Sequence, residues 1–432
     1  MSVIISVRVS KQIIPPFFHA GAAGTPVTGF IAMLLAALAL ALSAAGSARL
    51  RHVAGSTPHE RGRALGTTLG AAMQAIYDTK LARYSETPGA IAKWHAIANH
   101  TAAAIARYAP NTMAEIEGAA SALSARGTSP AVALMLAVEY ELLQSLAGDP
   151  LSAAAGDKCT GYAGVSAATP GSSVSGQNND EDPSLWLDGR LDVVLHYDSD
   201  GAAGGAVGGA AGGAPAALVY THPGYPAYMG VNARGLAVLW QYIDDGERDY
   251  TRVPTCVMLR ELLVQPTIEA ALALLREARV AVPNNIILSD ATRVANVEVS
   301  PSRFTLLSFE EGDVVHTNHY LFDQGSVDHD LSRNHSRTTL ARFDAMRAMV
   351  RQQRRKPVEG VGGVVPADAL AQMLSTAPVL RNATHGTDNA TLASMVFEPA
   401  TRRMRIRFKG DPWGHFLRLE LAENGTVQSW AS

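Results

Sequence analysis

The stretch GDKCTGYAG, residues 156–164, holds one of only two cysteines in the 432-residue chain. An Ala-rich pattern with helical periodicity precedes it, and a strand-rich pattern follows it. Cys159 therefore lies at a junction, directly before a threonine and a glycine. A cysteine in such a place is a small buried hydrophobe, half of a disulfide, a metal ligand or a nucleophile, and the surrounding sequence must decide among these.

The composition excludes several classes of protein. Hydrophobic residues make up 47% of the chain and charged residues 17%, so it can form a substantial core and is not generally disordered. The net charge is −3 and no basic stripe is present, which argues against a nucleic-acid partner. No metal-binding, P-loop or dinucleotide motif is present, so we expect neither a metal nor a cofactor. A disulfide between Cys159 and Cys256 remains open, although Cys256 lies in an apolar helical pattern typical of a core residue.

The N-terminal segment reads as a targeting sequence. Residues 29–48 carry no charge, follow Arg8, Lys11 and His19, and end in small residues. This run has the length of a membrane span and the small-residue end of a signal-peptidase site, with a buried core helix as the alternative. We therefore expect residues 1–48 to be a signal peptide or a signal anchor, and the protein to be secreted or membrane-anchored. Glycan acceptor motifs support this expectation weakly, at Asn99, Asn334, Asn382, Asn389 and Asn424.

The order of the remaining patterns predicts one layered α+β domain over residues 49–432. Residues 49–55 read as a short strand, and Ser56 or Thr57 is expected to cap a helix with Pro58 in its first turn. Helical periodicity continues to about residue 148. After Cys159 the sequence alternates apolar and polar residues as half-buried strands do, with helical patterns at 253–264, 267–279, 331–351 and 366–375. Such segregation of strands and helices is typical of α+β folds.

An ordered set of short motifs resembles a known family. Besides Cys159-Thr160, the set consists of TPHERGRALG (57–66), GQNND (176–180), GVNARGLAV (230–238), RVPTCVMLRELL (252–263), VEVSP (297–301), VVHTNHYL (314–321) and TLASMVFEPATRRMRIRFKGDP (391–412). In this order the motifs resemble the acyl-coenzyme A:6-aminopenicillanic acid (isopenicillin-N) acyltransferase family, which belongs to the Cys-type N-terminal-nucleophile (Ntn) hydrolases. The resemblance covers roughly residues 49–421.

The resemblance implies a four-layer αββα sandwich made as an inactive precursor. The precursor would cut itself between Lys158 and Cys159, giving a light fragment, 49–158, and a heavy fragment, 159–432, that stay associated. A thiol has a pKa of about 8.5 and an α-amine one of about 7.7–8.0, so the new amine of Cys159 can take the thiol proton without a histidine. The thiolate would then form an acyl-enzyme with a small acyl amide or an acyl-coenzyme-A-like thioester.

The resemblance also implies roles for five residues. Cys159 is the nucleophile, and Asp180 in GQNND orients its α-ammonium group. Asn318 matches an asparagine that the wider superfamily places in the active site. Gln241 stands where the family has an oxyanion-hole asparagine, whose side chain is one methylene shorter than that of glutamine. Arg303 lies near the position of the family's active-site arginine, with a local spacing that differs by about two residues.

Three departures from the family pattern leave alternatives open. Lys158 replaces the usual glycine before the cut, Gly161 replaces a hydroxyl residue, and Asn179 replaces an aromatic one. The leading hypothesis is a self-processing amidase or acyltransferase. One alternative is a membrane-tethered binding protein that kept the fold and lost processing, and another is an uncut enzyme with a Cys–His pair made by His316 or His319. In a strand these two histidines would face opposite sides, which argues against a metal pair.

Overall fold

The structure is a computed structural model, and it divides the chain into two units, residues 1–48 and 49–432. It describes residues 49–146, 159–166, 171–199, 213–243, 245–310, 312–322, 338–355, 364–382, 389–412 and 415–430. The predicted targeting segment 29–48 and the predicted cleavage residue Lys158 lie outside the described residues. The fold below is that of the second unit.

The transmembrane prediction is contradicted for the residues that the structure describes. Among the residues that the structure describes, no helix combines the length and the apolar character needed to cross a membrane.

One sheet, called sheet A here, has eight strands in the order β1-β4-β5-β6-β7-β8-β9-β10. Neighbouring strands are antiparallel except β1 and β4, which pair in parallel. The strands are β1 (Leu50–Val53), β4 (Val193–Tyr197), β5 (Ala217–Thr221), β6 (Met229–Asn232), β7 (Ala237–Tyr242), β8 (Asn284–Ser289), β9 (Val294–Val299) and β10 (Phe304–Glu310). Because β1 precedes Cys159, both predicted fragments contribute strands to this sheet.

The other sheet, sheet B, has seven antiparallel strands in the order β11-β2-β3-β12-β13-β14-β15. The strands are β2 (Cys159–Val165), β3 (Val174–Glu181), β11 (Gly312–His316), β12 (Ala390–Glu398), β13 (Arg403–Phe408), β14 (Leu417–Leu421) and β15 (Val427–Ser429). Every residue of β2 and β3 is buried, as expected for inner strands covered on both faces.

The two sheets pack face to face. Side chains of β3 reach β7 and β8: Gln177 donates from Nε2 to the Trp240 carbonyl at 2.5 Å, and Ser289 bonds Ser175 at 3.0 Å. Alternation along a strand then assigns the faces, because residues two apart point the same way. Cys159, Gly161, Gln177 and Asn179 therefore face sheet A, whereas Thr160, Tyr162 and Asp180 face away from it.

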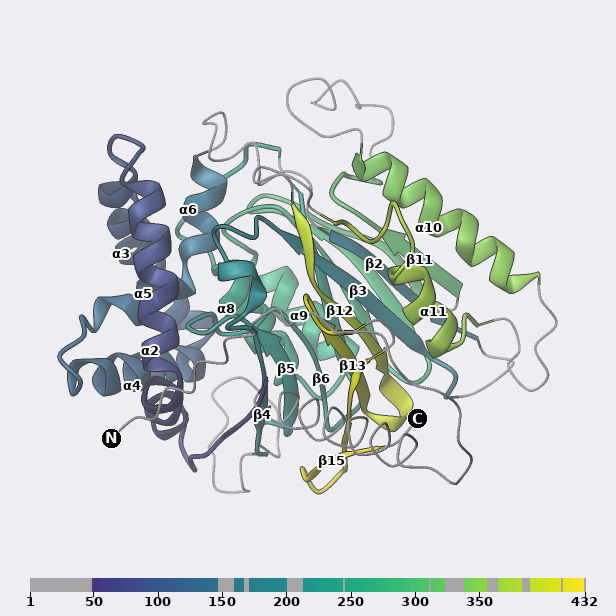
Figure 1. The fold of residues 1–432 in the computed structure, drawn as a ribbon, viewed down its shortest axis with the longest axis horizontal. Coiled ribbons are helices and arrows are strands. Elements are labelled where there is room, and N and C mark those ends of the chain that lie inside the picture. Colours follow the sequence, from purple (N-terminus) through teal and green to yellow (C-terminus); the bar gives the residue numbers. More distant parts are fainter. Residues whose placement is uncertain are drawn as a thin grey trace, which may run out of the picture. The chain divides into compact units, whose positions relative to one another are not determined.

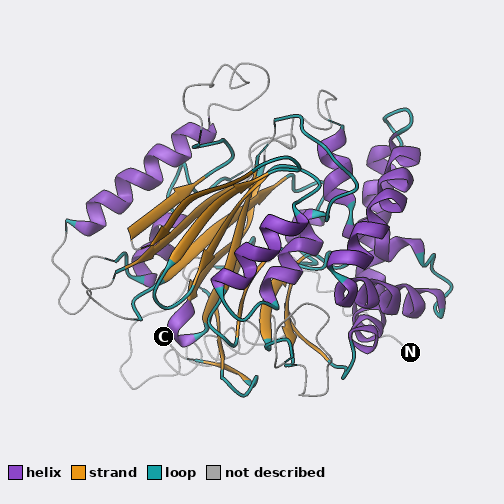
Figure 2. Cartoon of the chain, turned by 180° about the vertical axis from the view of Figure 1, so that it is seen from behind, coloured by secondary structure: helices purple, strands orange, loops and turns teal. Residues whose placement is uncertain are grey.

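Helices cover both outer faces of this pair of sheets (Figures 1 and 2). On the side of sheet A, Tyr140 packs edge-on against Trp240 and Tyr242. The helices of that side are α2 (Pro58–Tyr84), α3 (Ala90–Tyr108), α4 (Pro110–Ser124), α5 (Ala131–Ala137), α6 (Glu139–Ser145), α8 (Thr255–Leu263) and α9 (Ile268–Ala278). On the side of sheet B lie α10 (Thr338–Arg354) and α11 (Ala367–Leu374). The predicted four-layer αββα sandwich, the Ntn-hydrolase fold, is confirmed.

Local sequence accounts for the start of α2. The Thr57 side chain accepts from the Glu60 backbone amide at 3.2 Å, and the Glu60 carboxylate accepts from the Thr57 amide at 3.1 Å. This reciprocal pair is a capping box, and Pro58 occupies the first helical turn, where its missing N–H costs nothing. The sequence prediction of a cap at Ser56 or Thr57 is therefore confirmed at Thr57.

Buried polar contacts tie residues 49–158 to the rest of the domain. Glu115 of α4 accepts from Arg260 of α8 at 2.9 Å, and Thr112 donates to Glu261 at 2.5 Å. Glu139 accepts from the Tyr225 hydroxyl at 2.9 Å. These groups lie in the core, where truncation of one partner leaves the other with an uncompensated desolvation cost.

Candidate active site

Cys159 is the first residue of β2 and lies between β3 and the segment that follows β11. Its register partner on β3 is Asn179, and Gly161 pairs with His316 on β11, which places Cys159 beside Asn318. The Cys159 backbone N–H donates to Asn318 Oδ1 at 2.9 Å. The side chain is buried, with 1% of its surface exposed, and the two described cysteines do not form a disulfide with each other.

Asn318 is held from several directions. Its Nδ2 donates to the Tyr242 carbonyl on β7 at 2.9 Å, and its backbone N–H donates to Thr339 Oγ1 on α10 at 2.9 Å. The side chain thus bridges the nitrogen of Cys159 in sheet B and the end of β7 in sheet A. The structure brings Asn318 to the backbone nitrogen of Cys159, and its active-site role stays a prediction.

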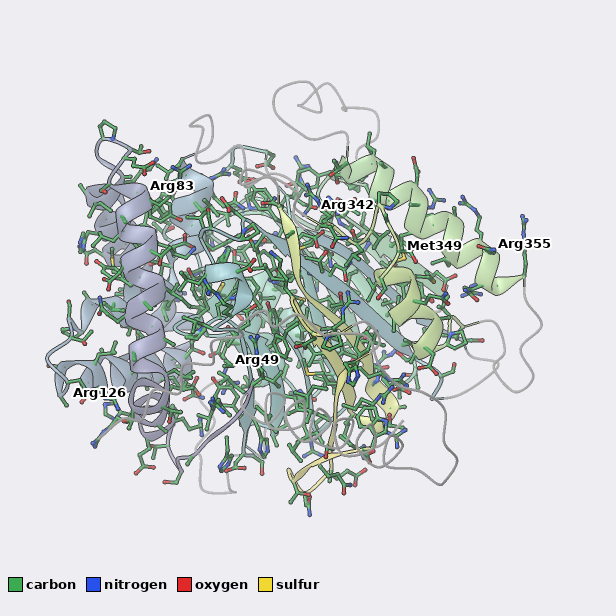
Figure 3. All side chains as sticks on the ribbon, in the orientation of Figure 1. Arg49, Arg83, Arg126, Arg342, Met349 and Arg355 are labelled. Carbon is green, nitrogen blue, oxygen red and sulfur yellow. The ribbon has the colours of Figure 1, made fainter. Side chains whose placement is uncertain are left out.

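Arg342 is a site residue that the sequence analysis missed. It lies in the first turns of α10, fully buried (Figure 3). Its guanidinium donates to Asn318 Oδ1 at 2.9 Å, to Thr160 Oγ1 at 2.8 Å, and to the Cys159 carbonyl. A buried arginine that bonds Cys159, Thr160 and Asn318 ties the first two residues of β2 to the segment that follows β11.

Arg303 lies elsewhere. It follows β9 in the turn before β10, where its backbone N–H donates to Ser300 Oγ at 3.2 Å. The guanidinium that contacts Cys159 belongs to Arg342, so the arginine selected from the family spacing is not the one that the fold brings to the cysteine. No local motif marks Arg342, which lies inside an ordinary helical pattern.

Asp180 and Cys159 occupy opposite sides of sheet B. Asp180 faces away from sheet A, and its Oδ1 accepts from Thr391 Oγ1 of β12 at 2.6 Å. It is buried and directly follows Asn179, the register partner of Cys159. The backbone nitrogen of the first strand residue can be approached from either face, so this placement is compatible with the predicted contact to an α-ammonium group, which stays a prediction.

Gln241 lies over Gly161 in the space between the sheets. Its Nε2 donates to Gln177 Oε1 at 2.6 Å, and its Oε1 accepts from Asn285 Nδ2 at 2.6 Å. A Cβ atom added to Gly161 would lie 2.3 Å from Gln241 Nε2. The Gln241 amide therefore occupies the space that a side chain at position 161 would need. Its oxyanion role stays a prediction.

His316 and His319 lie closer together than the strand pattern predicted. β11 ends at His316, so the chain turns before His319, and the two rings are 6.3 Å apart and nearly parallel. Their partners nevertheless belong to different layers, sheet A for His316 and α10 for His319. His316 is engaged through Nε2 with Glu298 at 3.0 Å, and His319 Nδ1 contacts Thr339 Oγ1 at 3.1 Å.

Burial and the neighbouring His316 ring lower the pKa of His319 to about 4, so its imidazole is neutral near pH 7. In the unfolded chain a histidine has a pKa of about 6.5, so between that pH and about 4 the unfolded state binds more protons than the folded one. As the pH is lowered from about 6.5 to about 4, we therefore expect the free energy of unfolding of the wild type to fall relative to that of His319→Gln. Urea denaturation of both proteins at pH 7.5, 5.5 and 4.5 measures the difference, and a difference that is constant with pH would contradict the assignment.

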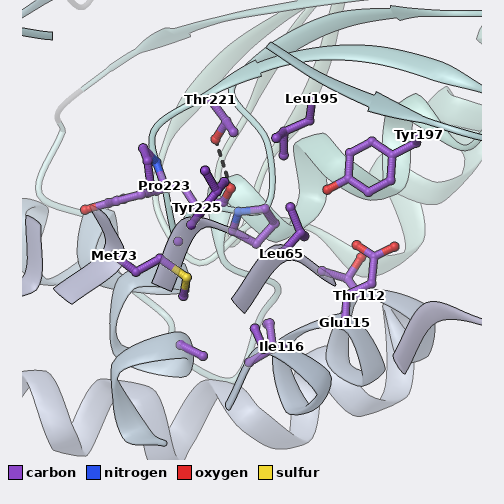
Figure 4. Close-up of a pocket in the computed structure, with 15 residues that line it drawn as sticks. Leu65, Met73, Thr112, Glu115, Ile116, Leu195, Tyr197, Thr221, Pro223 and Tyr225 are labelled. Atoms are coloured by element: carbon purple, nitrogen blue, oxygen red, sulfur yellow. Dashed lines mark hydrogen bonds between the residues drawn. The ribbon is translucent and has the colours of Figure 1, made fainter. Parts of the chain in front are cut away.

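A cavity of about 40 Å³ lies away from Cys159, between α2, α4 and the loop that follows β5 (Figure 4). Apolar side chains line most of it, including Leu65, Met73 and Ile116, with Glu115 and Tyr197 at one side. A cavity of this size holds a few water molecules at most. None of its lining residues is one of the predicted site residues, so we assign it to core packing.

The fold and the placement of Cys159 define a class: an Ntn-hydrolase sandwich with a cysteine at the first position of an inner strand. Residues 216–413 match the family model described as acyl-coenzyme A:6-aminopenicillanic acid acyl-transferase, which confirms the resemblance found in the sequence.

Among solved structures, a mutant of the conjugated bile acid hydrolase from Clostridium perfringens is 13% identical, with a TM-score of 0.44 over 63% of this chain and 97% of that one. Penicillin V acylase from Agrobacterium tumefaciens is 13% identical, with a TM-score of 0.40 over 63% of this chain and 98% of that one. No curated protein matches the chain. The family match supports an acyltransferase or acyl-amide hydrolase built on the Ntn fold.

Proposed function

We propose that the protein is a self-processing amidohydrolase or acyltransferase that cleaves or transfers the acyl group of a small acyl amide or thioester. Cys159 is the nucleophile, freed by cleavage of the Lys158–Cys159 peptide bond. One observation carries the proposal: the nitrogen that becomes the α-amine is already bonded to Asn318 Oδ1 at 2.9 Å, in a site whose backbone Arg342 fixes.

The chemistry needs no metal or cofactor in this proposal. The α-amine of Cys159 takes the thiol proton, and the thiolate attacks the acyl carbon. The tetrahedral intermediate collapses, the carbon–nitrogen bond breaks, and the α-ammonium returns the proton to the leaving amine. Water or an acceptor amine then attacks the thioester on Cys159. Asn318 orients the amine throughout, and Asp180 stabilises its charged form.

Gln241 is the proposed oxyanion donor. An amide nitrogen carries two hydrogens, and the described bond to Gln177 uses one of them. Asn285 holds the amide from its other end, so the second hydrogen has a fixed direction in the space that Gly161 leaves open. A donor that is fixed before the reaction stabilises a developing charge without reorganisation.

The test is Cys159→Ala beside the wild type, each analysed by intact mass. Wild-type protein should separate under denaturing conditions into a fragment ending at Lys158 and one of 274 residues, 159–432, whose Cys159 gains an acyl group from a library of acyl amides and thioesters. Under native conditions the fragments should migrate together, because they share sheet A and its buried contacts. Cys159→Ala should stay in one piece and gain no acyl group.

Two results would refute the proposal. Cleavage of Cys159→Ala at the wild-type rate would show that another group or another protein cuts the chain. A wild-type chain that remains in one piece and forms no adduct would indicate a binding protein on the same fold.

A further inference from the structure

Asn179 presents an amide beside the nucleophile. It is the register partner of Cys159 in the antiparallel β2–β3 pair and is fully buried. Side chains directly opposite one another in such a pair lie on the same face, with Cβ atoms about 5 Å apart. Both side chains therefore enter the space between the two sheets, at the end where the acyl group must reach Cys159.

The hydrogen-bond network fixes which way the Asn179 amide points. The Tyr220 hydroxyl donates to Asp192 Oδ2 at 2.7 Å, and Asn179 bonds the same hydroxyl at 3.1 Å. Burial and the Asp192 carboxylate raise the pKa of Tyr220 well above its usual value, so the hydroxyl keeps its single proton. Since that proton goes to Asp192, the Tyr220 oxygen can only accept from Asn179, which must offer Nδ2.

A second contact holds Asp192 in this arrangement. His222 Nδ1 bonds Asp192 Oδ1 at 2.5 Å, and the His222 ring stacks on Trp186 with centroids 3.9 Å apart. His222 thus holds the Asp192 carboxylate through Oδ1, while Oδ2 accepts from Tyr220. All four residues of the hydrogen-bonded series His222–Asp192–Tyr220–Asn179 are buried. The direction of each hydrogen bond therefore fixes the direction of the next, as far as Asn179.

The other polar atom of the Asn179 side chain, Oδ1, is not used by this network. Within the described part of the chain, Oδ1 is buried and has no hydrogen-bond partner. Its neighbour on the other side in sheet B is Ala393, which offers no polar side chain. An unpaired buried acceptor costs about 1–3 kcal/mol, and a ligand that donates a hydrogen bond to it would remove that cost.

We propose that Asn179 Oδ1 accepts the N–H of the scissile amide, and that the site thereby favours secondary amides over thioesters. The inference rests on the proposed function, whose nucleophile is the adjacent Cys159. A thioester with the same acyl group has no hydrogen at that position and leaves Oδ1 unpaired. Asn179 exchanges no proton in the reaction: it holds the nitrogen whose bond to the acyl carbon breaks, and the α-ammonium of Cys159 supplies the proton.

The experiment compares Asn179→Leu with the wild type on matched acyl donors. The probes are p-nitroanilides and p-nitrothiophenyl esters of acetyl, hexanoyl, decanoyl and phenylacetyl groups, and the readout is the rate at which Cys159 gains the acyl group, by intact mass. Loss of one substrate hydrogen bond predicts that the amide-to-thioester rate ratio falls by about tenfold or more. Tyr220→Phe, which removes only the group that orients Asn179, should lower the same ratio by about threefold.

The matched control is Asn296→Leu, because Asn296 is also a buried asparagine whose Oδ1 has no described partner, but on β9. This variant should change the acylation rates with the amide and the thioester by the same factor. An unchanged ratio in Asn179→Leu, or an equal loss with both donors, would overturn the inference. Failure of the proposed function is a different result: the processed wild type would then gain no acyl group from either kind of donor.

Discussion

Arg342→Met is expected to slow acylation of Cys159 by about 100-fold or more, with a loss of about 3 kcal/mol in the free energy of unfolding. The guanidinium bonds Asn318 Oδ1, Thr160 Oγ1 and the Cys159 carbonyl, all of them buried. Methionine keeps much of the volume but leaves these acceptors without that donor. Asn318 then loses the contact that fixes its oxygen toward the nitrogen of Cys159.

The control is Arg347→Met on the exposed side of the same helix, which should retain wild-type rates and stability. Acylation rates by intact mass and urea denaturation measure both effects. The site assignment would be contradicted by an Arg342→Met protein that is destabilised but acylates at the wild-type rate, because Arg342 would then act on the fold alone.

Gly161→Ala is expected to destabilise the protein by about 1–3 kcal/mol, the usual cost of an overpacked core. The added Cβ would lie 2.3 Å from Gln241 Nε2 and 3.0 Å from its Cδ, too close for either atom to stay. The amide must move, which breaks its bonds to Gln177 and Asn285. If Gln241 is the oxyanion donor, turnover falls at the same time, by about 100-fold or more.

A double-mutant cycle identifies the cause. Gly161→Ala combined with Gln241→Ala should be more stable than the sum of the two single changes predicts, by about 1 kcal/mol or more, because the colliding atoms are gone. Gly161→Ala with Asn285→Ala is the control, since Asn285 bonds Gln241 from the far side and does not occupy the space at Gly161. Equal coupling in both pairs would show that general loosening of the core, not the collision, explains the effect.

This pair of residues shows what the sequence could and could not predict. Gly161 and Gln241 each depart from the family pattern, and nothing in the sequence connects the two departures. The structure shows that they fit one another, because the side chain that is one methylene longer fills the volume of the missing Cβ. Complementarity of this kind depends on the distance between two sheets, which no local pattern contains.

Local signals predicted the elements well. The capping box places the start of α2, and apolar periodicity places α8, α9 and α11 to within a few residues. Motifs close to one another in sequence likewise predicted that Cys159 begins a strand. The sequence could not identify Arg342 as a site residue, because it lies 183 residues from Cys159. Its helix reaches Cys159 only through the packing of that helix on sheet B, which is a tertiary property.

The parallel pairing of β1 with β4 has a consequence for the lifetime of a processed enzyme. β1 comes from the light fragment and β4 from the heavy one, so cutting the Lys158–Cys159 bond turns an intramolecular strand pair into an association between two molecules. Refolding of the uncut chain is first order, whereas refolding of the cut protein becomes second order and slows with dilution. A processed molecule that unfolds in dilute solution therefore loses its partner before it can refold. Its working life is set by the rate of unfolding rather than by the equilibrium between folded and unfolded forms.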